Sequence, residues 1–232
     1  MNIDIHIYGV RARDDMIAAT ASKLGLSSDY IHYDDRPNGG LMMYTAKKAW
    51  LSPVSKGITH RICLSDDTEV CDDFLSIATK IAEAHPKSII SFFPYEFMRK
   101  TPEVEGLDTP YLKCHILSGC GIMMPIECIE PCFKYIKEHF NDTCDDDWGI
   151  QQWAKSASIE ILTTVPACVQ HIGDESIANK GCFIRRTVYY KEKPVANWET
   201  KKVMEYRPKE WFFSNHGKPS QTKGVLLDAS EC

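Results

Sequence analysis

Strand-like and helix-like hydrophobic patterns alternate along the first half of this chain, and that alternation constrains the fold more than any other feature. Apolar residues recur at every second position over 3–10, which is typical of a strand, and then at helical spacing over 14–24. The same order follows twice more, with strands and helices predicted at 30–33, 41–51, 59–64 and 74–84. Such alternation favours βαβ units and therefore a parallel sheet with helices on its faces.

The second half continues with the same kinds of element but in a less regular order. Further strands are predicted at 88–93 and 159–165, an apolar run covers 115–124, and helices are predicted over 126–140 and from Asp147 onward. A chain of 232 residues can bury a large core as one domain. We therefore expect a single α/β domain with a mostly parallel central sheet.

Composition and charge exclude several classes of protein. Hydrophobic residues make up 44% of the chain and charged residues 25%, which is globular and not disordered or fibrous. The net charge of −5 argues against a protein that holds duplex DNA by phosphate neutralisation alone. No apolar run approaches the roughly 18 residues of a membrane span, and the first residues do not resemble a secretion signal. We expect a cytoplasmic protein whose ten cysteines are reduced and mostly buried.

Two adjacent carboxylates, Asp66 and Asp67, follow directly after the apolar strand predicted at 59–64. Ligands of open α/β sheets bind outside the carboxyl ends of the strands, so a ligand is expected at this position. Carboxylate oxygens suit Mg²⁺ or Mn²⁺, which would in turn neutralise a diphosphate. The alternative is a structural role, in which Ser65 or Asp66 caps a short turn leading toward residues 72–73.

A lone histidine and a run of aspartates are the other candidates for chemistry. His171 follows the strand predicted at 159–165, and histidine is the commonest transition-metal ligand, although a structural histidine is the alternative. Asp145, Asp146 and Asp147 precede a helical pattern, where the helix dipole stabilises negative charge. Three adjacent carboxylates repel one another, which favours a base poised to accept a proton; an exposed acidic turn is the alternative.

In this order and spacing, the chain resembles the GT-A-type nucleotide-sugar glycosyltransferases, in a compact form like those encoded by bacteria and phages. The resemblance covers roughly residues 1–180. In the first half of the chain its markers are the opening strand and helix, the Asp34-Asp35 turn, and Ala49-Trp50 leading through 59–64 into Ser65-Asp66-Asp67, followed by Cys71 and Phe74. In the second half they are the Ser118-Gly119-Cys120-Gly121 loop with Pro125, the Asp-Asp-Trp-Gly-Ile run at 146–150, and the segment 164–173 with Ser176.

The resemblance implies a GT-A-like fold, with a Rossmann-type, mostly parallel sheet flanked by helices in one domain over 1–232. Residues 1–93 would form the nucleotide-sugar-binding half and 94–180 the acceptor half. The basic and aromatic segment 181–232 would be a C-terminal extension or lid, and packing of its aromatic residues against the core is the alternative.

The resemblance also implies a metal site and a donor site. Asp67 and His171 would bind the divalent cation, and Asp66 would contact the ribose or a metal-bound water. Ser65 stands where the family has the first acid of its DxD-like motif, so the metal would have one carboxylate fewer. Asp34 or Asp35 would hydrogen-bond the nucleobase or ribose.

The remaining roles that the resemblance implies concern the transfer step itself. Asp147, with Asp146 as the rival, would be the general base of an inverting transfer. The loop that passes close to the donor sugar would contain Ser118, Gly119 and Gly121, because glycine permits a close approach of the backbone.

The implied function is glycosyl transfer from a nucleoside-diphosphate sugar, with a UDP-sugar as the first candidate and Mn²⁺ or Mg²⁺ as cofactor. The acceptor would be a glycan, a lipid-linked intermediate or a hydroxymethylated DNA base, in the cytoplasm of a bacterium or a phage-infected cell; the net charge favours a glycan. One alternative is a metal-dependent nucleotidyltransferase, whose basic phosphate loop the segment 9–13 resembles only weakly. Another is a non-catalytic sugar-nucleotide-binding protein, which the serine at position 65 favours.

Overall fold

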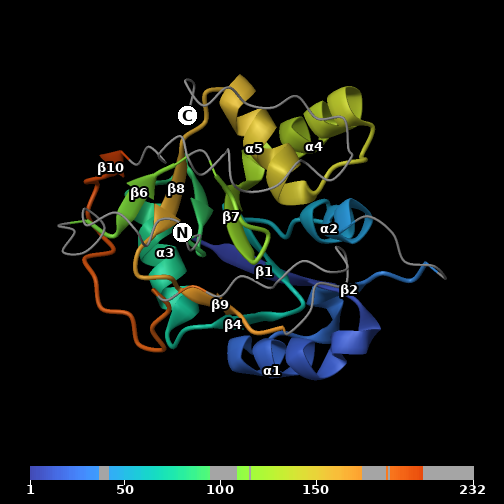
Figure 1. The fold of residues 1–232 in the computed structure, drawn as a ribbon, viewed down its shortest axis with the longest axis horizontal. Coiled ribbons are helices and arrows are strands. Elements are labelled where there is room, and N and C mark those ends of the chain that lie inside the picture. Colours follow the sequence, from blue (N-terminus) through green and yellow to red (C-terminus); the bar gives the residue numbers. More distant parts are fainter. Residues whose placement is uncertain (37–41, 95–108, 115, 174–186, 188, 206–232) are drawn as a thin grey trace, which may run out of the picture.

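The computed structural model describes residues 1–36, 42–94, 109–114, 116–173, 187 and 189–205, and Figure 1 shows an α/β arrangement with a central sheet flanked by helices. The strands are β1 (Ile3–Gly9), β2 (Ile31–Tyr33), β3 (His60–Ser65), β4 (Thr68–Val70), β5 (Ile89–Ser91), β6 (Tyr111–Lys113), β7 (Gly121–Pro125), β8 (Ile161–Thr164), β9 (Val169–His171) and β10 (Met204–Glu205). The helices are α1 (Asp14–Leu24), α2 (Met42–Trp50), α3 (Phe74–Ala84), α4 (Ile126–Phe140) and α5 (Asp146–Ser156). Of the helices described, none is long and apolar enough to cross a membrane.

Eight of these strands form one sheet in the order β10-β6-β8-β5-β7-β3-β1-β2. Four of the seven neighbouring pairs are parallel, which confirms the mostly parallel sheet. β7 runs antiparallel between β3 and β5, which the hydrophobic periodicity does not predict. Because β7 is reversed, the loop that precedes it arrives at the edge of the sheet where β1 and β3 end.

A separate two-stranded sheet joins β4 to β9 in antiparallel register, with Thr68 opposite His171. Neither strand is predicted by the sequence patterns, because each has only three residues. Asp66 and Asp67 form the turn between β3 and β4, and the N-cap of α3 is Asp73, so neither Ser65 nor Asp66 caps a helix; a structural role of the pair in this turn remains the alternative.

The helices cover both faces of the sheet and divide the core into two layers. Side chains of α1 and α3, such as Ile17 and Phe74, pack with Ile5 and Ile7 of β1 on one face. α2, α4 and α5 pack on the other face, where Tyr8 lies. Figure 1 shows α1 and α2 on opposite sides of β1 and β2, and α4 beside α5.

The predicted nucleotide-sugar-binding half and acceptor half do not form separate parts of the main sheet. β7 and β8 come from the segment 94–180, yet they pair directly with β3 and β5 from the segment 1–93. The boundary at residue 93 stays a prediction about function. Most of 181–232, including the proposed lid, lies outside the described residues.

Arg61 of β3 is fully buried and ties β1 to the end of α2. Its guanidinium donates to both carboxylate oxygens of Asp4, at 3.0 and 2.7 Å. The remaining donors reach the backbone carbonyl groups of Ala49 and Trp50 at the end of α2 and of Ser52 and Pro53 just after it. Strand β3 is thereby held against the segment that carries Trp50.

A pair of histidines lies next to this ion pair, on β1 and β2. Nδ1 of His6 is 2.8 Å from Nε2 of His32, and Nε2 of His6 is 3.5 Å from Asp4 Oδ2. Burial, together with the positive charges of His6, Arg61 and Lys48, lowers the pKa of His32 to about 4. The folded protein therefore holds His32 neutral at a pH at which an unfolded chain would protonate it.

We expect this histidine to make the protein lose stability on acidification. Because the folded pKa lies below the unfolded value of 6.5, the unfolded state binds more protons between about pH 4 and 6.5, and the free energy of unfolding rises with pH across that window. Between pH 7.5 and 5 the contribution of His32 is at most about 2 kcal/mol. Urea unfolding of wild type and His32→Gln at both pH values measures it, and parallel pH profiles for the two proteins would contradict it.

Candidate active site

The candidate site lies at the edge of the main sheet where β1 and β3 end and β7 begins. Tyr8 is in register with Ser65, and Leu64 is in register with Gly121. The turn after β3 supplies Asp66 and Asp67 to this edge. The loop before β7 supplies Ser118 and Gly119, β9 supplies His171, and the start of α5 supplies Asp146 and Asp147.

Asp66 and Asp67 are buried and share one arginine. Nη1 of Arg13 lies 2.8 Å from Asp66 Oδ1 and also contacts Asp67 Oδ2. The Val10 N–H donates to the other oxygen of Asp66 at 2.8 Å. Burial and the adjacent charge of Asp67 raise the pKa of Asp66, whereas contacts with His171 and Arg13 outweigh burial and lower the pKa of Asp67. Asp67 is therefore more readily ionised than Asp66.

Gly9 allows Asp66 to approach the end of β1. A Cβ at position 9 would lie 2.1 Å from the Cβ of Asp66, closer than two unbonded atoms can come. A side chain at this position would displace the turn that carries both carboxylates. The glycine that ends the first predicted strand thus has a packing role at the site.

His171 and Asp67, the two cation ligands that the resemblance implies, contact each other directly. His171 Nε2 lies 2.8 Å from Asp67 Oδ2, and the Ile172 N–H donates to the Asp67 carbonyl at 2.8 Å. The other carboxylate oxygen of Asp67 accepts a hydrogen bond from the Ser65 hydroxyl at 3.0 Å. Ser65, which replaces the acid of the family motif, therefore orients Asp67.

Asp67 Oδ2 contacts both His171 Nε2 and Arg13 Nη1, and Asp67 Oδ1 accepts from the Ser65 hydroxyl. A carboxylate oxygen and an imidazole nitrogen are ligand types that divalent cations use, so Asp67 and His171 are the candidates for a cation site. Within the described ranges, no group of three histidine, cysteine or acidic side chains is arranged to hold a metal ion. Arg13 brings a positive charge to the same carboxylate oxygen.

Asp146 and Asp147 form the first turn of α5 and point to different partners. Asp146 is 1% exposed, and its Oδ2 accepts hydrogen bonds from the Tyr8 hydroxyl at 3.0 Å and the Trp50 indole at 3.4 Å. Asp147 is half-buried and accepts from the Gly119 N–H at 3.1 Å. Burial, reinforced by the neighbouring carboxylates, raises the pKa of both side chains. Asp146 is anchored inside the protein, whereas Asp147 reaches the surface.

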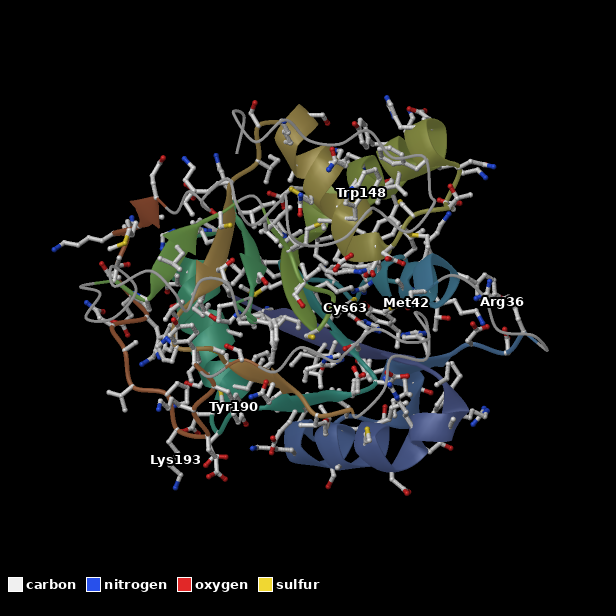
Figure 2. All side chains as sticks on the ribbon, in the orientation of Figure 1. Arg36, Met42, Cys63, Trp148, Tyr190 and Lys193 are labelled. Carbon is white, nitrogen blue, oxygen red and sulfur yellow. The ribbon has the colours of Figure 1, made fainter. Side chains whose placement is uncertain are left out.

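Asp34 and Asp35 lie at the end of β2, to the side of these groups. Asp34 forms a two-point ion pair with Arg36, and its backbone N–H donates to the Gly9 carbonyl at 2.8 Å. Asp35 is exposed and pairs with Lys48. Figure 2 shows Arg36 at the outer end of the segment after β2, away from the centre of the molecule. The structure therefore places Asp34 on the edge that carries the site and Asp35 outside it.

The short loop 118–121 lies between the Asp66–Asp67 pair and the Asp146–Asp147 pair. The Thr68 hydroxyl, next to Asp67, donates to the Cys120 carbonyl at 2.7 Å, and the Gly119 N–H donates to Asp147. Ser118 is buried and Gly121 begins β7, where a Cβ would lie 3.1 Å from a methyl group of Leu64. The predicted loop 118–121 thus connects the candidate metal ligands with the candidate base.

Three residues that contact the candidate site are not among the residues predicted from the sequence. Tyr8 and Trp50 both hold Asp146, and Arg13 holds the carboxylate pair. The weak basic motif at 9–13 is a signal for Arg13. Trp50 is among the markers of the resemblance, but nothing in the sequence connects Tyr8 or Trp50 with Asp146, because each lies more than 90 residues from it.

No family model matches this chain, and no curated protein matches it either.

Proposed function

We propose that this protein is a glycosyltransferase that moves a sugar from a nucleoside-diphosphate sugar to an acceptor hydroxyl. The observation that supports it is the shared loop, in which consecutive residues Gly119 and Cys120 bind Asp147 on one side and Thr68 beside Asp67 on the other. Such a transfer requires two parts, namely a group that neutralises the negative charge of the donor phosphates and a general base that takes the proton of the acceptor hydroxyl. The candidates for these two parts, Asp67 with His171 and Asp147, lie at the edge of the sheet where ligands of α/β sheets bind.

The donor diphosphate would bind at Asp67, His171 and Arg13. When bound, Mn²⁺ or Mg²⁺ would neutralise the charge that develops on the departing nucleoside diphosphate. Asp67 and His171 would hold the cation, and Arg13 would supply a second positive charge to the same region. Asp34 lies further along this edge, next to β1, at the position proposed for the nucleoside, and a UDP-sugar is the first donor to test.

Asp147 would remove the proton from the acceptor hydroxyl. The acceptor oxygen then bonds to the anomeric carbon as the bond from that carbon to the diphosphate oxygen breaks, and the nucleoside diphosphate leaves with the electron pair. Attack from the opposite face inverts the anomeric centre. A raised pKa suits Asp147 to this task, because a general base works best when its pKa lies near the operating pH.

Product analysis tests this function against the two alternatives. Purified protein is incubated with sugar nucleotides and Mn²⁺ or Mg²⁺, and the nucleotide products are separated. Release of nucleoside diphosphate supports glycosyl transfer, whereas release of pyrophosphate from a nucleoside triphosphate and a sugar phosphate would indicate a nucleotidyltransferase. Binding of a sugar nucleotide without any product would indicate a binding protein.

We expect Asp67→Asn and His171→Ala each to weaken binding of UDP in the presence of Mn²⁺ by about 10- to 100-fold, the loss of one charge-assisted contact. Isothermal titration calorimetry with and without Mn²⁺ measures the effect. Asp35→Asn is the matched control, because Asp35 is exposed and pairs with Lys48 away from the site. Unchanged affinity in both variants would remove Asp67 and His171 from the donor site.

A further inference from the structure

Arg13 holds a positive charge at the point where the candidate cation ligands converge. Its Nη1 atom lies 2.8 Å from Asp66 Oδ1 and also contacts Asp67 Oδ2, the oxygen that faces His171 Nε2 at 2.8 Å. One guanidinium nitrogen thus bridges two buried carboxylates. Adjacent carboxylates repel each other, and a positive charge between them offsets that repulsion. Arg13 therefore provides the charge compensation that a bound cation would otherwise provide.

The Oδ2 atom of Asp67 has both of its lone pairs engaged while Arg13 is in place. A carboxylate oxygen carries two lone pairs, and on Oδ2 they face Arg13 and His171. The other carboxylate oxygen accepts from the Ser65 hydroxyl at 3.0 Å. A cation held by both Asp67 and His171 would bind at Oδ2, so it would meet the guanidinium on the same atom. Two positive charges that share one oxygen repel each other, and more strongly in a buried site than in water.

The Arg13 side chain lies close to the surface, whereas Asp67 lies beneath it. The side chains of Arg13 and His171 are 11% and 19% exposed, and that of Asp67 is 5% exposed. The Arg13 backbone N–H donates to the Val10 carbonyl at 3.0 Å, so the turn before α1 is held by the main chain and the guanidinium can move without it. Asp66 keeps its hydrogen bond from the Val10 N–H when Arg13 moves.

We propose, building on the proposed function, that Arg13 closes the cation site of the free protein and must release Asp67 before Mn²⁺ or Mg²⁺ can bind. The guanidinium and the cation compete for Oδ2 of Asp67, so each lowers the affinity of the site for the other. Once released, Arg13 is available to the phosphates of the donor, whose proposed site lies at the same edge. Arg13 is thus a positioning residue that determines when Asp67 accepts a cation.

The test is Mn²⁺ binding to the purified protein without nucleotide, measured by isothermal titration calorimetry. Arg13→Met removes the guanidinium and keeps an unbranched side chain. Arg11→Met is the matched control, because it removes the same charge from an exposed arginine that packs over the Tyr33 ring. The double variant Arg13→Met/Asp66→Asn keeps the net charge of wild type and leaves only one carboxylate at the site, so it carries the test if Arg13→Met does not fold.

We expect Arg13→Met and the double variant to bind Mn²⁺ about 10- to 100-fold more tightly than wild type, the factor that corresponds to one charge-assisted hydrogen bond. Arg11→Met should bind Mn²⁺ as wild type does, and adding His171→Ala should abolish the gain. Unchanged, weaker or absent Mn²⁺ binding without Arg13, or a gain that survives His171→Ala, would overturn the inference. Failure of the proposed function is a separate result, namely no nucleoside diphosphate released from any sugar nucleotide.

Discussion

Replacing Asp147 by Asn is expected to lower turnover by about two to four orders of magnitude, the usual effect of losing a general base. The amide has nearly the same shape and can still accept the hydrogen bond from the Gly119 N–H, so the loop and the donor site should be preserved. Turnover is measured as release of nucleoside diphosphate from the sugar nucleotide that wild type uses, and UDP affinity is measured by calorimetry.

The control for this experiment is Asp29→Asn, which changes an exposed acid outside the site and should leave turnover near the wild-type value. An Asp147→Asn enzyme as active as wild type would assign the base to Asp146 or to another group. A variant that loses UDP binding together with turnover would mean that Asp147 supports the donor site and does not act on the acceptor alone.

Replacing Arg61 by Met is expected to cost about 3–5 kcal/mol of the free energy of unfolding, because it leaves a buried charge without its partner. Asp4 would lose both guanidinium hydrogen bonds. The carbonyl groups at the end of α2 and just after it would lose their donors as well, and Trp50, whose indole holds Asp146, is the last residue of α2. We therefore expect lower activity as well as lower stability.

Urea unfolding measures the stability of this variant. Arg11→Met is the matched control, because Arg11 is an exposed arginine that packs over the Tyr33 ring, and exposed substitutions usually change stability by less than about 0.5 kcal/mol. A loss below about 1 kcal/mol for Arg61→Met would show that the buried ion pair contributes little, as some buried pairs do.

The local elements of the fold could be predicted from short stretches of sequence. The predicted and observed limits of α1 and α3 coincide, and β3 ends one residue before Asp66. Hydrophobic periodicity reports which face of a helix or strand is buried, and that information is complete within some ten residues. The same reasoning correctly placed two carboxylates at the carboxyl end of a buried strand.

The α/β class, most helices and strands, and the residue types available for chemistry can thus be derived from the sequence alone. Which of these residues contact one another depends on the tertiary structure. The reversal of β7, the pairing of β4 with β9, and the contacts of Tyr8 and Trp50 with Asp146 all join segments far apart in the chain. Such contacts depend on sheet order and register, which no short window of sequence contains, and only they bring Asp67 to His171 and Asp147 to Gly119.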